Sequence, residues 1–431
     1  MRLPKPSLTR SRGLNYFFYS LAALLLQGLF PLIGKEVPRA TPAEVGMSTG
    51  KLDAAAAVVK SYVDQKRIAG AITIVARRGR IVDQRTYGHM DIERSKPMRE
   101  DAIFRIYSMS KSIITAGALM LHEEGKFELE DPVHNFLPTF KNLKVLGKDT
   151  KSTHPNKKDM TVADLMRHTS GLSYGFVGNT RVEKAYNRLG LPGRAKNLDT
   201  FVAQLAKVPL RFEPGEKWLY SVSTDVLGKL VEVWSGKSLD VFLAERIFNP
   251  LDMRDTGFHV PKDKLPRFTA NYGSDGKGGL RCIDDPLESN YCQPPTFFSG
   301  GGGLVSTGRD YLRFLLMVQQ GGHLQGTRLL KSETVNLMTT NQLPKKLMPI
   351  QINQPPRSGV GFGYGFSVRT KMTEWDPGAK VGEFGWGGAA STHYWVHPRD
   401  ELVVVTLEQT MPYSFLTEWG IKQLIYEAIE N

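Results

Sequence analysis

Hydrophobic and polar positions follow regular spacings near the N-terminal end of the chain. Apolar residues recur at helical spacing over 48–65. The apolar run 71–76 and the strand-like segment 81–87, which is apolar at both ends, then surround the tripeptide Arg78-Gly79-Arg80. Spacing of this kind predicts one helix followed by a β-hairpin.

The C-terminal end repeats this organisation in reverse. Strand-like runs occur over 363–369, 393–396 and 402–407, and an amphipathic pattern covers 415–430. The pattern predicts further strands and a terminal helix. Strands at both ends of a chain can pair in one sheet.

The region between the two ends carries mostly helical spacing, with examples over 162–167, 201–206, 224–234, 239–248 and 310–319. We therefore expect an α/β (α+β) fold with one domain over 35–431. Its antiparallel sheet comes from both chain ends (about 40–107 and 350–431), is flanked by the terminal helices, and carries a large, mostly helical insertion (about 108–349). A cleft between sheet and insertion is a usual place for a site.

Composition restricts the class of protein. Hydrophobic residues at 41% and charged residues at 23% are ordinary for a folded enzyme. The formal net charge is +13, but the basic residues are scattered and often adjoin acidic ones, as in Glu216-Lys217. Because no basic stripe is interleaved with aromatic residues, nucleic acid is not expected as a partner.

Residues 1–34 are predicted to be a targeting segment. Four basic residues precede a stretch without charge over 14–34. This stretch is about as long as a membrane span, and no clear small-x-small cleavage site follows it. Either a signal peptide or an uncleaved membrane anchor fits. In both cases the basic residues at the start of the segment stay in the cytoplasm, so the rest of the chain is expected to be exported, periplasmic or extracellular.

The two cysteines, Cys282 and Cys292, lie ten positions apart in a segment with Gly, Pro and Asp. In an exported protein they could form one disulfide that closes a loop. Two free thiols are the alternative. The sequence leaves both possibilities open.

The tetrapeptide Ser108-Met109-Ser110-Lys111, followed by an apolar run over 112–121, carries the strongest chemical signal. In a helix that begins near Ser108, the Lys111 amine lies one turn later on the same face and can reach the hydroxyl. The helix dipole favours a developing alkoxide there, and burial favours the uncharged amine. Since S-x-x-K is common in surface helices, its partners decide whether it is catalytic.

Hydrolysis also needs a group that protonates the leaving group and then deprotonates water. A tyrosine hydroxyl hydrogen-bonded to Lys111 can move protons both ways. The candidate is Tyr220, which follows a Pro-Gly turn and precedes a predicted helix. A tyrosine that only packs is the alternative, because the chain has fifteen.

A third element is Gly385-Trp386-Gly387-Gly388-Ala389, at the start of a predicted strand. Acyl transfer needs two N–H donors for the oxyanion, and glycines let a substrate approach an edge strand closely. A plain glycine turn is the alternative.

In this order, the three elements resemble the serine β-lactamase and penicillin-binding-protein superfamily. Within it, the chain is most similar to class C β-lactamases and family VIII carboxylesterases. The resemblance covers essentially everything after residue 40. Four further stretches agree with the family in the same order: 129–133, 165–172, 248–253 and 299–304.

The resemblance implies a β-lactamase-like fold and a Ser-Lys-Tyr centre without metal or cofactor. Ser108 would be the acylated nucleophile, Lys111 its base and Tyr220 the proton shuttle. The backbone N–H groups of Ser108 and Ala389 would form the oxyanion hole. Substrate would bind along Trp386, Gly387 and Gly388, and Ser110 would be a helix residue.

Two departures concern the substrate. Where the lactamases have Tyr-x-Asn and Lys-Thr-Gly, this chain has Tyr220-Ser221-Val222 and Trp386-Gly387-Gly388. The second change removes a cation that would pair with a substrate carboxylate, and a buried carboxylate without a partner is costly. Family VIII carboxylesterases have a similar Trp-Gly-Gly form.

We therefore expect a serine hydrolase that cleaves small carboxylic esters. One alternative is a β-lactamase or D-alanyl-D-alanine carboxypeptidase that acts on β-lactams or cell-wall peptides. Another is a non-catalytic protein that binds envelope ligands or serves as a scaffold.

Three other motifs are weaker. Gly171-Leu172-Ser173-Tyr174-Gly175 matches G-x-S-x-G, but a helical pattern precedes it where that motif needs a strand, so Ser173 is not the expected nucleophile. His393 and His397 have a spacing that binds metal on a helix, whereas their segment predicts a strand. His168 is expected to be a structural hydrogen-bonding residue.

Overall fold

The computed structural model describes residues 1, 2, 4, 36–352 and 355–430. The chain divides into two compact units, Met1–Glu36 and Val37–Asn431. The predicted targeting segment, residues 1–34, falls outside the described residues except at positions 1, 2 and 4, so it stays a prediction. In the part of the chain that is described, every helix is too short or too polar to cross a bilayer.

Both ends of the unit Val37–Asn431 contribute to one eight-stranded sheet, in the order β12-β13-β14-β15-β16-β1-β2-β3. Its strands are β1 (Gly70–Arg77), β2 (Arg80–Asp91), β3 (Lys96–Pro97), β12 (Val360–Phe362), β13 (Ser367–Arg369), β14 (Phe384–Gly388), β15 (Thr392–His397) and β16 (Leu402–Glu408). β1 pairs antiparallel with β16, from Ala71 opposite Glu408 to Arg77 opposite Leu402. The predicted α/β fold with a sheet from both chain ends is confirmed.

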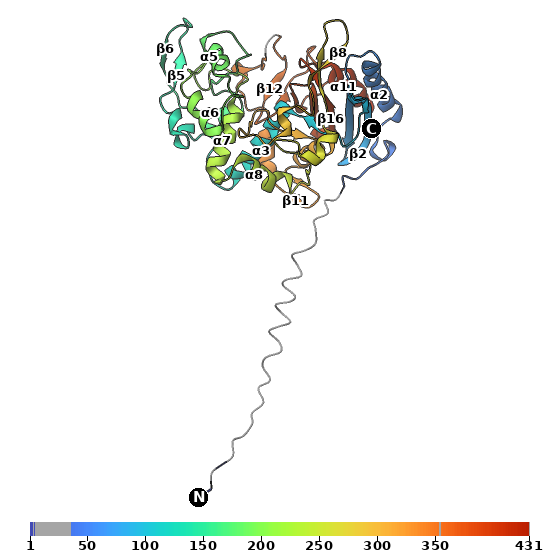
Figure 1. Cartoon of the computed structure of the whole chain (residues 1–431), viewed down its shortest axis with the longest axis horizontal. Helices are drawn as coiled ribbons and strands as arrows, with labels where there is room; N and C mark the ends of the chain where they lie inside the picture. The colour runs from blue at the N-terminus through green and yellow to red at the C-terminus, as the bar shows by residue number, and fades with distance from the viewer. Residues whose placement is uncertain (3, 5–35, 353–354, 431) are drawn as a thin grey trace. The chain divides into compact units, whose positions relative to one another are not determined.

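The terminal helices α2 (Thr49–Asp64) and α11 (Leu416–Glu427) lie beside one another on one face of this sheet (Figure 1). Ala71 and Val75 of β1 point into this layer, whereas Ile72 and Ile74 point into the main core on the other face. Because successive side chains of a strand alternate between faces, burial on both sides leaves all eight residues of β1 buried.

The middle of the chain is mostly helical, as predicted. Its helices are α3 (Ser110–Glu123), α4 (Val162–Met166), α5 (Arg181–Leu189), α6 (Leu198–Leu205), α7 (Ser223–Ser235), α8 (Leu239–Leu243), α9 (Gly308–Gln319) and α10 (Ser332–Thr339). The sequence pattern did not predict its short strands: β4 (Phe104–Arg105), β5 (Lys144–Leu146), β6 (Thr153–Pro155), β7 (Asn271–Ser274), β8 (Leu280–Asp284), β9 (Val305–Ser306), β10 (His323–Leu324) and β11 (Thr327–Arg328). Another short strand, β17 (Thr410–Met411), pairs with β7.

Two predicted boundaries are wrong. The run 363–369 is not one strand, because β12 ends at Phe362 and β13 begins at Ser367, with Gly365 at a φ of 85° in the turn between them. The helix predicted to begin near Ser108 begins as α3 at Ser110, and Ser108 lies in the 3-10 turn before it.

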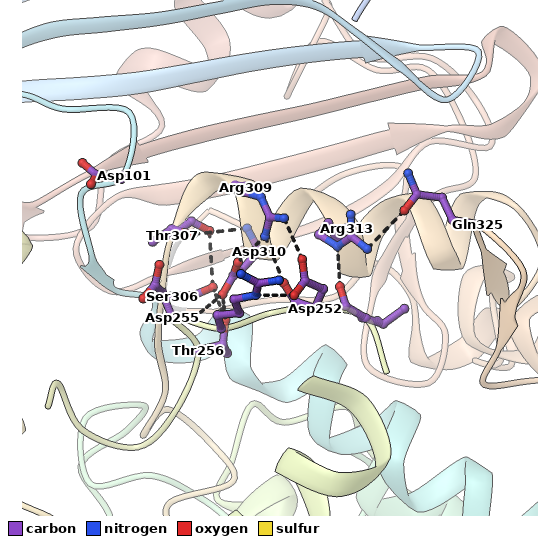
Figure 2. A network of polar contacts seen from close by, with 12 residues as sticks. Asp101, Asp252, Asp255, Thr256, Ser306, Thr307, Arg309, Asp310, Arg313 and Gln325 are labelled. Atoms are coloured by element: carbon purple, nitrogen blue, oxygen red, sulfur yellow. Dashed lines mark hydrogen bonds and ion pairs between the residues drawn. The ribbon is translucent and has the colours of Figure 1, made fainter. Parts of the chain in front are cut away.

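A polar network ties the start of α9 to a preceding loop (Figure 2). The Thr307 side chain accepts a hydrogen bond from Asp310 N at 3.2 Å and caps the helix. Asp310 in turn accepts from Asp255 N at 2.7 Å and from the Thr256 hydroxyl at 3.0 Å. Burial raises the pKa of Asp310 to about 6. The loop is thereby fixed to a helix that packs on the sheet.

The two cysteines are separate free thiols. Cys282 lies on β8, and the Cys292 thiol donates a hydrogen bond to the carbonyl of Pro286 at 2.9 Å. Burial raises the pKa of both thiols. Of the two alternatives from the sequence, the structure has the unbridged one.

Candidate active site

Ser108 lies in a strained turn at the start of a buried helix. The preceding residue, Tyr107, has a φ of 40°, a left-handed conformation that non-glycine residues rarely adopt outside functional or strained sites. Ser108 is partly exposed, whereas its neighbours Met109 and Ser110 are buried. Of the two serines in the motif, Ser108 and not Ser110 is therefore accessible.

Lys111 Nζ lies 3.2 Å from Ser108 Oγ. It also donates to the carbonyl of Gly301 at 2.5 Å, and only 1% of the residue is exposed. Nζ lies 4.7 Å from the ring centroid of Tyr220 and 5.5 Å from that of Tyr174. One carbonyl and two aromatic rings thus hold the amine against the serine.

Tyr220 approaches the same hydroxyl from the loop before α7. Its hydroxyl donates a hydrogen bond to Ser108 Oγ at 2.6 Å. Its ring packs against Trp386, with 5.5 Å between centroids, and against His168, with 5.0 Å. The structure brings Ser108, Lys111 and Tyr220 together, and their catalytic roles stay predictions.

The support behind Lys111 was not found from the sequence. Asp225 of α7 accepts hydrogen bonds from the Ser299 hydroxyl at 2.5 Å and from Gly301 N at 3.0 Å. Burial raises the pKa of Asp225, and the charge of Lys111 lowers it. A Cβ on Gly301 would lie 2.4 Å from Asp225 Oδ2, so no larger residue fits there. The four consecutive glycines of 300–303 were a visible signal, but spacing alone did not show which carbonyl faces the lysine.

The glycine motif lies on a strand, as predicted: Gly385 to Gly388 make up β14 after its first residue, Phe384, and Ala389 follows the strand. β14 pairs with β13 only through Phe384 and Gly385. Among the described residues, no strand pairs with Trp386–Gly388 on that side, so this part of β14 is a sheet edge. A Cβ on Gly388 would lie 2.4 Å from the carbonyl oxygen of Ile106, which shows how closely the edge approaches the nucleophile turn. The N–H groups of Ser108 and Ala389 as an oxyanion hole stay a prediction.

The weaker motifs have structural roles. Ser173 is fully buried and donates a hydrogen bond to Glu183 Oε1 at 2.8 Å, and the nearest preceding element is the helix α4, not a strand. His168 is also buried, with its Nδ1 3.3 Å from the Ser221 hydroxyl. Burial, and to a smaller extent the charge of Lys111, hold the pKa of His168 well below its usual value.

His393 and His397 lie on β15, as their segment predicted. Behind this strand, the carboxylates of Asp376, Glu383 and Glu418 converge closely enough to hold a metal ion. The ammonium of Lys422 already occupies the space between them, at 2.9, 2.8 and 2.7 Å from their oxygens. This cluster is therefore a buried ion-pair network.

Two hollows lie near the candidate site. One is lined by Tyr107, which precedes Ser108, together with Asn271, Ile283, Tyr291 and Met411. The other is lined by Trp386, which packs on Tyr220, together with Arg357, Ser367, Tyr413 and Phe415. Each hollow thus reaches the candidate site through one neighbouring residue, Tyr107 or Trp386, and is not lined by Ser108, Lys111 or Tyr220 themselves.

Comparison with known proteins identifies relatives over nearly the same span. The Beta-lactamase family profile matches residues 55–423. Protein Rv1367c from Mycobacterium tuberculosis is 35% identical over 369 residues, which are 84% of this chain and 90% of that protein. Esterase EstB from Burkholderia gladioli is 30% identical over 395 residues, which are 86% of this chain and 95% of that protein. The structure of EstCE1, described as a hydrolase with promiscuous acyltransferase activity, has a TM-score of 0.75 at 25% identity and covers 87% of this chain and 98% of its own.

Proposed function

The chain belongs to the beta-lactamase family of serine enzymes, and we propose that it is an exported hydrolase that cleaves small carboxylic esters through an acyl-Ser108 intermediate. One observation carries the proposal: Ser108 Oγ lies 3.2 Å from Lys111 Nζ and 2.6 Å from the Tyr220 hydroxyl. The esterase relative supports it. Export rests on the segment 1–34.

In the acylation step, Ser108 Oγ attacks the ester carbonyl carbon while Lys111 takes its proton and relays it to Tyr220. The carbonyl oxygen becomes an oxyanion held by the N–H groups of Ser108 and Ala389. When the intermediate collapses, the bond to the alcohol oxygen breaks, and Tyr220 gives that oxygen a proton. The alcohol leaves, and Ser108 carries the acyl group.

In the second step, water attacks the acyl carbon and gives a proton to Tyr220, which relays it to Lys111. The bond between the acyl carbon and Ser108 Oγ then breaks, and Oγ takes that proton from Lys111. Both steps need a proton carrier near Ser108 in either direction. The Tyr220 hydroxyl and the Lys111 amine, both in contact with the same Oγ, meet this need.

We expect purified protein to hydrolyse p-nitrophenyl acetate and butyrate with a kcat/KM about 10-fold or more above that for nitrocefin. The reason is that Trp386-Gly387-Gly388 offers no side-chain cation to the carboxylate of a β-lactam. Absorbance assays of the three substrates give the comparison. Faster nitrocefin turnover would favour the β-lactamase alternative. No turnover, with no labelling of Ser108 by a fluorophosphonate probe, would favour the non-catalytic alternative.

Acyl transfer to an alcohol is a second candidate, favoured by the description of EstCE1. An alcohol in the place of water would attack the same acyl-Ser108 carbon and form a new ester. With p-nitrophenyl butyrate and 1-butanol, we expect butyric acid to exceed butyl butyrate. Gas chromatography measures both products, and a larger amount of butyl butyrate than of acid would assign the chain to the transferases.

A further inference from the structure

Arg357 brings a cation to the glycine edge from another part of the chain. It lies shortly before β12, and its backbone N–H donates to the carbonyl of Ile350 at 2.9 Å. Its guanidinium carbon lies 5.1 Å from the ring centroid of Trp386, 5.2 Å from that of Phe415 and 5.6 Å from that of Trp375. Contacts of this length hold the guanidinium through cation–π attraction.

This guanidinium has no carboxylate partner within 4.0 Å among the described residues. The acids that line the same hollow, Asp376, Glu383 and Glu418, are all bonded to Lys422. Arg357 is partly exposed, and its guanidinium also hydrogen-bonds to the Tyr413 hydroxyl in the same hollow, so a ligand carboxylate would share the guanidinium with a neutral partner and not with an acid.

The hollow beside Arg357 lies on the side from which the alcohol part of an ester would leave. Tyr220 has to give a proton to the leaving oxygen, so that oxygen lies next to the Tyr220 hydroxyl. Trp386 packs on Tyr220 at 5.5 Å, and Arg357 packs on Trp386 at 5.1 Å. The guanidinium is therefore about one aromatic ring farther from the scissile bond than Trp386.

On this geometry, and on the proposed esterase function, we propose that Arg357 binds a carboxylate at the far end of the alcohol part of the substrate. The favoured substrates are then esters of hydroxy acids whose carboxylate lies about one benzene ring from the ester oxygen. Guanidinium groups bind carboxylates through two parallel hydrogen bonds. A carboxylate close to the scissile bond, as in a β-lactam, would not reach past Trp386.

The test compares 4-acetoxybenzoate, whose leaving phenol is anionic, with 4-acetoxybenzamide, whose leaving phenol is neutral. In Arg357→Gln we expect kcat/KM for the anionic ester to fall about 10- to 100-fold, chiefly through KM, and that for the neutral ester to change less than about 3-fold. Arg357→Lys keeps a positive charge and should therefore keep part of the kcat/KM for the anionic ester that Arg357→Gln loses. Arg67→Gln is the matched control, because Arg67 also lies over a ring, that of Tyr62 at 5.0 Å, but is exposed on the loop after α2.

An equal loss for both esters in Arg357→Gln would show that the arginine only positions Trp386, and no loss would show that it is not used. Either result overturns the inference.

Binding of the product 4-hydroxybenzoate to Ser108→Ala protein separates this inference from the esterase proposal, because it needs no turnover. Calorimetry should give a Kd about 10-fold or more weaker after Arg357→Gln is added, with no such change for 4-hydroxybenzamide. An unchanged Kd for 4-hydroxybenzoate would refute the carboxylate site even if the esterase assays succeed. If instead the Kd weakens as expected and neither ester is turned over, the proposed function alone fails.

Discussion

Replacement of Ser108 by alanine is expected to lower kcat/KM for p-nitrophenyl acetate by about 1,000-fold or more. The substitution removes the atom that both Lys111 and Tyr220 contact, so no acyl-enzyme can form. Spectrophotometric assay of p-nitrophenol release measures the loss. Mass spectrometry of protein mixed with substrate should detect an acetyl group on Ser108 of the unaltered enzyme and none on the variant.

Ser173→Ala is the matched control, because Ser173 belongs to the one competing serine motif weighed from the sequence. Its hydroxyl bonds to Glu183 in the interior, so this variant should keep most of the activity and lose some stability. Full activity in Ser108→Ala, or loss of activity only in Ser173→Ala, would overturn the assignment of the nucleophile.

Replacement of Lys422 by methionine is expected to destabilise the protein by about 3–5 kcal/mol. Burial lowers the pKa of the Lys422 ammonium, but Glu383, Glu418 and Asp376 outweigh this effect and raise it above its usual value. Without the cation, three buried carboxylates face one another with less compensation. Urea unfolding followed by circular dichroism measures the change, because the free energy of unfolding extrapolates linearly to zero denaturant.

Lys51→Met is the matched control, because it also removes a lysine that pairs with a carboxylate of helix α11. Lys51 pairs with Glu427 of α11 at 2.6 Å, and both side chains are more than 40% exposed. Exposed pairs contribute little, so this variant should unfold close to the unaltered protein. Similar midpoints for the two variants would mean that the buried ion-pair network around Lys422 contributes no more to stability than an exposed pair.

Local patterns predicted most of the fold. The 3.6-residue spacing of Leu52, Ala55 and Val59 reflects one buried helix face, and the nearly continuous apolar run of β1 reflects burial on both faces of the sheet. The error over 363–369 has the same origin. Phe362 and Phe366 are both buried, so hydrophobicity alone did not reveal the turn between β12 and β13.

The site was predictable only as far as its chemistry is local. Ser108 and Lys111 are three residues apart, so helix geometry alone brings their atoms together. The contact of Tyr220 with Ser108 spans 112 positions. The turn and helix around Tyr220 made it a candidate, and only resemblance to a family favoured the shuttle role over simple packing. Asp225 and Arg357 belong to no motif of that kind, because each acts through tertiary contacts that no spacing encodes.

The pairing of β1 with β16 also affects how the protein is made. The residue opposite Ala71 is Glu408, so β1 obtains this neighbouring strand only after residue 408 has been synthesised. Contacts between such distant segments give a high contact order and slow folding. Until β16 arrives, the hairpin of β1 and β2 has an open apolar edge on which a chaperone or an unwanted strand could dock.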